Sequence, residues 1–437
     1  MTTQIFSRSN LISISVSHFK GLYHLLLSVV LLVLCCSVSF GQSYDMVIKG
    51  GHVIDPRNQI DGPMDIAVVG DTIARVATDI PANEAERVID AEGLYVTPGL
   101  IDIHTHNFWG TKPDAYLSNS FASLPPDGFT FRAGVTTVVD AGSAGWKNFR
   151  LFKEHVVDKS KTRVLAFLNI VGSGMKGGAV EQNMVDMNPR TTAIVAGQYP
   201  EIVGIKLAHY NGHDFTPAER AVEAGEEADV PVMVDFGSAD PPLSIKTLLL
   251  DVLRAGDIYT HMYGGGRGNR QAVVDENGQL RDGMLEAQEK GRIFDIGHGG
   301  GSFFYPVAIP AFEQGLKPNT ISTDLHTGSM NGGMKNMLNV VSKMMDMGMS
   351  LQEVILTSTW KPAQVIQREE LGHLSEGAVA DIAIFTMREG DFGFLDSDEL
   401  LKSGATQKLE TEVTIRAGEV VYDLNGLAAP QWNDEKQ

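Results

Sequence analysis

Short runs in which hydrophobic and polar residues alternate lie near both ends of the chain. The runs cover residues 44–55, 65–69, 72–76, 380–385 and 412–422. Alternation with a period of two, interrupted by Gly and Asp, is typical of antiparallel strands that bury one face. We therefore expect the two ends of the chain, residues 42–95 and 369–437, to pair into one small β-sandwich that the rest of the sequence splits.

The middle of the chain, residues 96–368, alternates short apolar runs with longer stretches that are compatible with helices. The apolar runs end near His104, Asp140, Val171, Lys206, Asp235, His261, His298 and Asp324. Successive ends are about 31 residues apart on average, close to the roughly 30 residues of a βαβ unit. Eight such units predict an α/β fold, a (β/α)₈ barrel of the TIM type.

Two helical stretches have features that we assign to packing. Residues 217–228 follow Thr216, a candidate N-cap, with Glu219 three residues further on. Residues 330–349 contain seven methionines, which fit a helix core filled with adaptable side chains. We assign no chemistry to either stretch.

The first 41 residues have the features of a signal peptide. Arg8 and Lys20 precede an apolar run at 25–38, and residues 39–41 place small side chains at positions −3 and −1 of a cleavage site. The alternative is an uncleaved membrane anchor, but the apolar run is shorter than the about 20 residues that span a bilayer. We therefore expect export to the periplasm or the extracellular space.

Composition narrows the classes of partner. The 54 acidic and 35 basic residues give a net charge of −19, which repels nucleic-acid phosphates and anionic lipid headgroups. We expect a small-molecule substrate, no nucleic acid and, in the mature form, no membrane; a homo-oligomer stays open. The only cysteines, Cys35 and Cys36, lie in the predicted leader, so nitrogen and oxygen atoms would hold any metal in the mature chain.

The segment 98–106, Pro-Gly-Leu-Ile-Asp-Ile-His-Thr-His, is the most informative motif of the chain. Residues two apart in a strand project from the same face, so His104 and His106 can bind one metal ion together. The polar residues that end the later apolar runs would converge with this pair, because active sites of (β/α)₈ barrels lie at the carboxyl ends of the strands. The sequence therefore predicts a metal-binding site at that end.

The chain resembles the amidohydrolase superfamily of metal-dependent hydrolases over essentially all of its predicted mature length. The resemblance rests on residues 98–106, on the split β-domain and on the late segment 372–384, Gly-His-Leu-Ser-Glu-Gly-Ala-Val-Ala-Asp-Ile-Ala-Ile. The chain is most similar to the amidohydrolase/deacetylase branch, often labelled dihydroorotase-like, through four further segments. These are Val203-Gly-Ile-Lys206, Asp257-Ile-Tyr-Thr-His261, Phe294-Asp-Ile-Gly-His298 and Ser322-Thr-Asp-Leu-His326.

The resemblance implies a centre of two divalent metal ions. His104 and His106 would bind the first ion, and Lys206, carboxylated by CO₂ to N6-carboxylysine, would bridge the two. A buried lysine amine with a lowered pKa can form this carbamate, whose two oxygens reach two cations; a structural ion pair is the alternative for Lys206. Zinc is the default ion for such ligands, with manganese, cobalt and iron open.

The fifth strand departs from the pattern of the family. His261 fits the ligand expected on the sixth strand, but Asp235 occupies the position at which the fifth strand should carry a histidine. A carboxylate still suits a divalent ion, and we favour Asp235 as a ligand. Two alternatives stay open: His209 or His213 substitutes as the ligand, or the second metal position is weak or empty.

The resemblance also assigns roles near the substrate. Asp324 would contact the metal and handle the proton; alone, it would fit a helix N-cap or an Asx turn. His298 is expected to act as a second catalytic residue that contacts the substrate or polarises its carbonyl group. The candidate substrate contacts after the sixth strand are Tyr263, Arg267 and Asn269. An arginine there would clamp a carboxylate, although a solvated loop side chain is the alternative for Arg267.

These assignments predict a metal-dependent hydrolase. It would cleave an amide or ester bond of a small acylated amino or hydroxy acid by metal-activated hydroxide, with deacylation as the reaction. A cyclic amidase of the dihydroorotase or hydantoinase type is an alternative, because the metal ligands do not distinguish open-chain from cyclic substrates. A second alternative is a non-catalytic binding protein with a decayed metal site, which only Asp235 favours.

Overall fold

The computed structural model describes residues 43–109, 122–235, 239–265 and 270–432. Residues Tyr44–Gln437 form one compact unit. The predicted leader, residues 1–41, lies outside the described residues, as do Arg267 and Asn269. Within the described ranges, no helix has the length and apolar character needed to cross a membrane.

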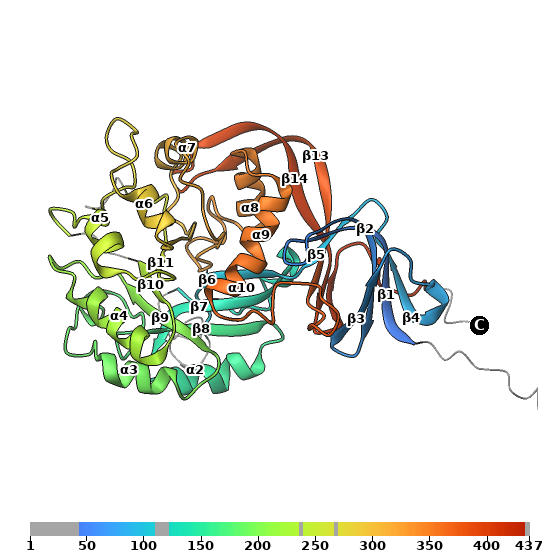
Figure 1. The fold of residues 1–437 in the computed structure, drawn as a ribbon, viewed down its shortest axis with the longest axis horizontal. Coiled ribbons are helices and arrows are strands. Elements are labelled where there is room, and N and C mark those ends of the chain that lie inside the picture. Colours follow the sequence, from blue (N-terminus) through green and yellow to red (C-terminus); the bar gives the residue numbers. More distant parts are fainter. Residues whose placement is uncertain (1–42, 110–121, 236–238, 266–269, 433–437) are drawn as a thin grey trace, which may run out of the picture. The chain divides into compact units, whose positions relative to one another are not determined.

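Seven parallel strands form one curled sheet, in which neighbours along the chain are also neighbours in the sheet (Figure 1). They are β6 (Leu100–Thr105), β7 (Val135–Gly145), β8 (Arg163–Asn169), β9 (Ile202–Ala208), β10 (Val232–Asp235), β11 (Ile258–Tyr259) and β12 (Ile293–Phe294). Strands β9 and β10 are buried along their whole length, as parallel strands covered on both faces should be. The sheet confirms the predicted α/β class and its repeated βα units.

The eighth apolar run, at residues 320–325, has no regular strand but joins both edges of this sheet. Isolated parallel bridges link Thr105 to Leu325 and Asp295 to Thr320. Asp324 has a φ of +50°, which lies outside the β region and interrupts strand geometry at this point. The run therefore lies between β6 and the residues after β12 without forming a continuous ladder.

Helices connect the strands of the parallel sheet. They are α2 (Phe149–His155), α3 (Pro189–Ala196), α4 (Thr216–Ala228), α5 (Ile245–Thr247), α6 (Met284–Glu289), α7 (Tyr305–Glu313), α8 (Met337–Asp346), α9 (Leu351–Ser358) and α10 (Trp360–Val365). Helix α4 begins one residue earlier than predicted, and Thr216 does not cap it: the Asp214 carboxylate accepts the N–H of Thr216 at 2.9 Å. Buried methionines such as Met337 and Met344 confirm a packing role for α8, which is shorter than the predicted stretch.

Strands from the two ends of the chain share a second sheet of eight strands. They are β1 (Tyr44–Asp55), β2 (Ile60–Val69), β3 (Thr72–Ala77), β4 (Ala85–Asp90), β5 (Tyr95–Pro98), β13 (Ile382–Leu395), β14 (Leu401–Arg416) and β15 (Glu419–Asp423). The antiparallel pair of β5 and β13 joins strands from the two ends of the chain. The runs predicted as antiparallel strands do pair in that direction, β1 with β2, β2 with β3 and β13 with β14. Two further strands, β4 and β5, run parallel to β1.

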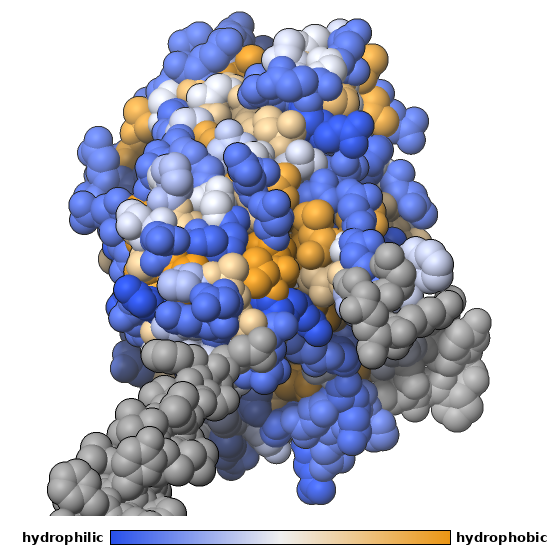
Figure 2. All heavy atoms as spheres, turned by 90° about the vertical axis from the view of Figure 1, so that its right-hand side faces the viewer, coloured by the Kyte–Doolittle hydropathy of each residue, from blue (hydrophilic) through white to orange (hydrophobic). Residues whose placement is uncertain are grey.

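The long hairpin of β13 and β14 extends from this sheet to α7 and α8 (Figure 1). The Tyr305 hydroxyl on α7 donates to the carbonyl oxygen of Phe394 at 2.9 Å, and Lys343 on α8 donates to the carbonyl oxygen of Leu395. Figure 2 shows a mostly hydrophilic face, with hydrophobic side chains gathered near its middle. The hairpin therefore connects the split sheet with the helices beside the parallel sheet.

Candidate metal centre

Parallel strands bring polar residues together at their carboxyl ends. His104 lies on β6, Lys206 lies on β9, Asp235 ends β10 and His261 follows β11 by two residues. Asp324 lies in the bridging run at 320–325. These five side chains are buried. Ionisable groups withdrawn from water need one another or a bound ion as partners.

The first set of contacts, here named the Asp324 group, joins His104, His106 and Asp324. The Oδ1 atom of Asp324 lies 2.9 Å from Nε2 of His106 and 3.6 Å from Nε2 of His104. The Nδ1 atom of His104 lies 2.8 Å from the Thr260 hydroxyl, which itself donates to Asp295. Because that hydroxyl proton is engaged, Nδ1 of His104 carries the imidazole proton and Nε2 keeps a lone pair.

The Asp324 carboxylate stays ionised although it is buried. Burial acts to raise its pKa, but the neighbouring His104, His106 and His326 outweigh this effect, so the pKa lies well below the usual range of an aspartate. The Nε2 atom of His326 lies 3.6 Å from Oδ2 of Asp324. The sequence reasoning quoted His326 within a motif but gave it no role.

Lys206 lies next to the Asp324 group. Its side chain is fully buried, and its Nζ atom lies 3.3 Å from Nε2 of His104. Burial lowers the pKa of the amine, and the neighbouring carboxylates of Asp235 and Asp324 oppose this effect only in part. A lower pKa increases the neutral fraction of the amine, which is its nucleophilic form.

A second set of contacts, here named the Asp235 group, joins His209, Asp235 and His261. The Oδ2 atom of Asp235 lies 3.3 Å from Nε2 of His261 and 3.4 Å from Nε2 of His209. The other oxygen, Oδ1, accepts a hydrogen bond from Arg270 at 2.7 Å, a residue that the sequence reasoning missed. Burial acts to raise the pKa of Asp235, but His261 and Arg270 hold it well below the usual range. His213, the other alternative ligand, is exposed.

The donor atoms of these side chains fit a divalent cation. Ligand atoms of His104, His261 and Asp324 all lie within 4.8 Å of one another. Imidazole nitrogen and carboxylate oxygen suit zinc, manganese, cobalt and iron. The Asp324 group and the Asp235 group adjoin each other, because the ring centroids of His104 and His261 are 4.9 Å apart.

The described contacts of His298 are with residues outside these two groups. Its ring nitrogens contact Nζ of Lys343 and the carbonyl oxygen of Gly299, and the ring stacks on Phe303 with centroids 4.7 Å apart. Burial and then the nearby Lys343 hold the pKa of His298 well below its usual range. These contacts hold the His298 ring in place within the fold. A contact between His298 and a substrate stays a prediction.

Lys343 is a second fully buried lysine, and burial lowers its pKa from 10.5 to about 7. Between these pH values the unfolded chain binds a proton that the folded chain does not, so the free energy of unfolding should rise with pH, by up to about 1.4 kcal/mol for each pH unit. We expect Lys343→Met to remove this slope. Chemical denaturation of both proteins between pH 6.5 and pH 9.5 checks this, and a difference in stability that does not change with pH would contradict it.

The structure corrects the expected substrate contact at Tyr263. The Tyr263 ring is fully buried in the hydrophobic core, and its hydroxyl donates to the carbonyl oxygen of Leu316 at 2.8 Å. The sequence places Tyr263 only two residues after His261, but the chain turns here and directs the ring inward. The other two candidate contacts, Arg267 and Asn269, lie outside the described residues.

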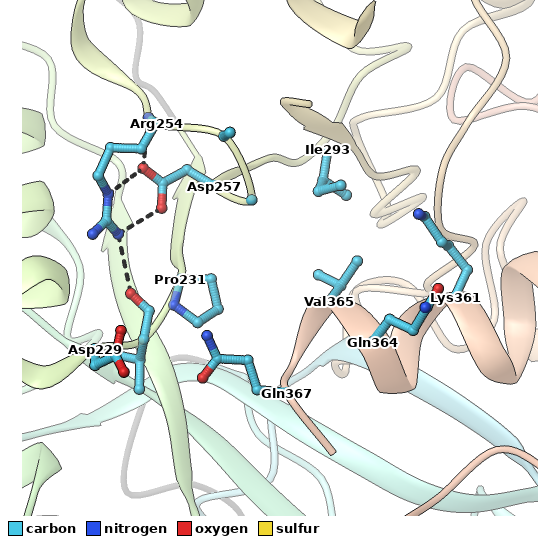
Figure 3. Close-up of a pocket in the computed structure, with 12 residues that line it drawn as sticks. Asp229, Pro231, Arg254, Asp257, Ile293, Lys361, Gln364, Val365 and Gln367 are labelled. Atoms are coloured by element: carbon cyan, nitrogen blue, oxygen red, sulfur yellow. Dashed lines mark hydrogen bonds and ion pairs between the residues drawn. The ribbon is translucent and has the colours of Figure 1, made fainter. Parts of the chain in front are cut away.

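A separate cavity of about 360 Å³ lies at the amino-terminal ends of the strands (Figure 3). Pro231 precedes β10, Asp257 precedes β11, and Val365 ends α10. Arg254 donates to the Asp257 carboxylate at 2.8 Å and to the carbonyl oxygen of Val230 at 3.0 Å. In barrels of this kind the amino-terminal face serves stability, so we assign the cavity no role in catalysis.

Known proteins are similar to this chain in sequence and in fold. The sequence profile described as Amidohydrolase family matches residues 306–421. A protein named deacetylase from Brucella anthropi is 33% identical over 347 residues, which are 77% of this chain and 83% of that protein. A solved structure described as an adenine deaminase has 29% identity and a TM-score of 0.77, and the match covers 87% of this chain and 100% of that one. A structure described as a dihydroorotase has 28% identity and a TM-score of 0.74, with 86% and 99% covered.

These matches and the buried histidine and carboxylate groups define the class of protein: it is a hydrolase with a TIM-barrel-type fold. The chain belongs to the amidohydrolase family, whose members generally bind divalent metal ions. This confirms the resemblance that the motif at 98–106 indicated.

Gly299 packs directly against the Asp324 carboxylate. A Cβ atom at this position would lie 2.4 Å from Oδ2 of Asp324, and the φ of +55° disfavours any other residue. The Gly299 N–H donates to the carbonyl oxygen of Thr323 at 2.9 Å. The loop that contains Gly299 therefore limits the positions that the Asp324 carboxylate can take.

We expect Gly299→Ala to displace the Asp324 carboxylate and to lower hydrolytic kcat/KM by about 10²-fold, since a shift of 1 Å in a reacting group can cost this much. The matched control is Gly301→Ala, because a Cβ atom at Gly301 meets nothing within 4 Å. Steady-state kinetics of the two variants checks the expectation. Equal activities in the two variants would contradict it.

Proposed function

We propose that this chain is an exported, metal-dependent deacetylase that hydrolyses an amide or ester bond of a small acylated amino or hydroxy acid. The observation that carries the proposal is the buried Asp324 group, in which one carboxylate and two histidines adjoin the fully buried Lys206. The deacetylase name of a relative that matches most of the chain supports the choice of reaction.

The proposal includes a complete (β/α)₈ barrel. The run at 320–325 would take the place of the eighth strand, because it bridges β6 on one side and the residues after β12 on the other. This arrangement would place Asp324 at the carboxyl end of the last strand. Active sites of this barrel type lie at that end.

The proposal also includes two zinc ions, with manganese, cobalt or iron as alternatives. His104, His106 and Asp324 would hold one ion, and Asp235 and His261 would contribute to the other. Lys206 would bridge the two as N6-carboxylysine, for which its burial and lowered pKa give support. A bound divalent cation supplies Lewis acidity, which polarises a carbonyl oxygen and makes water a stronger acid.

The side chains of the chain itself would move the proton. Hydrolysis forms a bond from a water oxygen to the acyl carbon and breaks the bond from that carbon to the leaving nitrogen or oxygen. The ionised Asp324 would accept the proton of the attacking water and return it to the leaving group. His106, 2.9 Å from Oδ1 of Asp324, would hold the carboxylate in place during both transfers.

The second candidate function is a cyclic amidase. The structure described as a dihydroorotase, 28% identical over 86% of this chain, favours it. The same proton transfers would open a cyclic amide, because both reactions add water across a C–N bond. The difference lies in the shape of the substrate rather than in the Asp324 group.

A substrate panel tests the two candidates against each other. The purified protein, loaded with Zn²⁺ or Mn²⁺, would be assayed on N-acetyl amino acids, on O-acetyl hydroxy acids, and on dihydroorotate and hydantoins. Release of acetate from an open-chain substrate supports the deacetylase, and ring opening without acetate release would replace it by the cyclic amidase. Binding of panel members without turnover of any of them would leave a non-catalytic binding protein.

Export is a further part of the proposal, and it rests on the charged and apolar pattern of residues 1–41. The mature chain would act on a small molecule, without nucleic-acid or membrane partners, and a homo-oligomer is compatible with it. Cell fractionation and amino-terminal sequencing test the export step. A mature protein that begins at Gln42 supports it, and full-length protein retained in the cytoplasm would contradict it.

A further inference from the structure

We propose that a cavity between η2 (Phe131–Ala133), the start of α8 and strands β14 and β15 binds a phosphate group, either free or carried by a small molecule. The cavity has a volume of about 300 Å³. Three cationic side chains line it, those of Arg132, Lys335 and Lys408, together with the buried Thr411. The site is independent of the proposed function, because none of these residues belongs to the Asp324 group or the Asp235 group.

Hydrogen bonds between different elements hold the walls of this cavity together. Strand β14 lies beside α8 (Figure 1), and the Leu409 N–H on β14 donates to Oγ of Ser342 on α8 at 3.0 Å. The Thr414 hydroxyl, also on β14, donates to the carbonyl oxygen of Phe131 in η2 at 2.7 Å. A site whose walls are joined in this way exists before a ligand binds, which lowers the entropic cost of binding.

Positive charge gathers at this cavity in a chain whose net charge is −19. Of the four charged side chains in the lining, only that of Glu410 is acidic, and Arg388 pairs with it at 2.8 Å. The described contacts of the three cations are with aromatic rings and a carbonyl oxygen. They join Arg132 to the Phe129 ring, Lys408 to the Phe392 ring and Lys335 to the carbonyl oxygen of Gly332. Cations that carboxylates do not neutralise attract an anion.

Two buried hydroxyl groups belong to residues that line the cavity. Thr411 is 2% exposed, and its hydroxyl has no hydrogen-bond partner among the described residues. A buried polar group without a partner is rare in folded proteins and points to a bound ligand. Ser342 is also buried and accepts the Leu409 N–H, so its own O–H remains able to donate. Phosphate oxygens accept such hydrogen bonds strongly because they are charged.

The start of α8, a helix of ten residues, adds further donors. Asn336 is its N-cap, and Oδ1 of Asn336 accepts the N–H of Asn339 at 2.9 Å, which leaves the amide N–H groups of Asn336 to donate. Leu338, the second residue of the helix, also lines the cavity. The first N–H groups of a helix have no partner within it, and the helix dipole favours an anion there. Combined with the three cations and the Thr411 hydroxyl, these donors favour phosphate, which accepts several hydrogen bonds at once.

Calorimetric titration of the metal-loaded protein at constant ionic strength tests the site, with inorganic phosphate and glycerol phosphate as probes. We expect saturable binding to the wild type. Lys408→Gln and Arg132→Gln should each weaken it by about 10-fold, because each removes a charge-assisted hydrogen bond. The matched control is Lys290→Gln, which removes the same charge from an exposed ion pair with Glu286 and should leave the affinity unchanged.

The two probes distinguish the sources of the phosphate group. Tighter binding of glycerol phosphate assigns the site to a phosphate ester, and tighter binding of inorganic phosphate assigns it to the free ion; both support the proposal. Equal affinity in the wild type and the cavity variants would place the phosphate elsewhere, for example at the metal centre, and would overturn it. The proposal also fails if the wild type shows no saturable binding, or if Lys290→Gln weakens binding as much as the cavity variants do.

Thr411→Val tests the role of the hydroxyl by a second measurement. Valine keeps the shape of the side chain and removes the hydroxyl, so the phosphate-free variant should be at least as stable as the phosphate-free wild type. Its affinity for phosphate should be lower. Chemical denaturation without phosphate and calorimetry measure the two effects. A less stable variant with unchanged affinity would show that the hydroxyl serves the fold and would overturn its assignment as a ligand.

Discussion

Asp324→Asn should lower kcat/KM for the hydrolysed substrate by roughly 10²- to 10⁴-fold, the usual contribution of a general acid or base. The amide keeps the size of the side chain and an oxygen that can face a cation, but it cannot accept a proton. Metal content should therefore stay at the wild-type value. Steady-state kinetics and plasma mass spectrometry on the same protein preparation measure both quantities.

The matched control for this variant is Asp229→Asn. Asp229 is exposed and has a φ of +55°, close to the +50° of Asp324, so both substitutions test asparagine in the same backbone conformation. The control should retain wild-type activity. If Asp324→Asn were to keep activity within about threefold of the wild type, another group would have to handle the proton.

Lys206→Met should lower both metal content and activity. Loss of an outer-shell partner lowers metal affinity or activity by about 10- to 100-fold, and loss of a direct ligand should lower them further. We therefore expect kcat/KM to fall by more than about 10²-fold. The metal-free variant should be at least as stable as the metal-free wild type, because methionine replaces a fully buried amine without burying a charge. Chemical denaturation of the two metal-free proteins measures this second effect.

Lys343→Met is the matched control, since Lys343 is the other fully buried lysine among the described residues. It should keep its metal, because Lys343 contacts His298 and backbone carbonyl groups of Gly333 and Leu395. Labelling with ¹³C-bicarbonate separates carboxylation from a simple ion pair at Lys206. A carbamate carbon signal should be present in the wild type and absent in Lys206→Met, and its absence from both proteins would contradict carboxylation.

The parallel sheet and the Asp324 group could be foreseen because their signals are local in the sequence. Apolar runs that end in His104, Lys206 and Asp235 indicate buried parallel strands, and parallel strands present their ends on one side. The spacing of His104 and His106 already places both side chains on one face of a strand. The sequence did not indicate that the run ending in Asp324 is irregular, because the φ of +50° at Asp324 depends on tertiary contacts.

Residues that act through long-range contacts gave no comparable signal. Glu181 and His209 are 28 positions apart, and Arg270 is 35 positions from Asp235, so only the folded chain brings them together. Tyr263 was misassigned because the sequence reports its distance along the chain from His261 but not the direction of its ring. The partner of His298 is Lys343, 45 positions away, on a helix to which the sequence reasoning assigned only packing.

The most direct test of the central claim, metal-dependent hydrolysis, is the rate of acetate release by one protein preparation before chelation, after chelation and after reloading with Zn²⁺ or Mn²⁺. Activity should disappear with the metal and return with it, with an O-acetyl or N-acetyl acid as the substrate. Undiminished hydrolysis by protein shown to be metal-free would contradict the claim. So would the absence of hydrolysis across the substrate panel by protein shown to be folded and fully loaded.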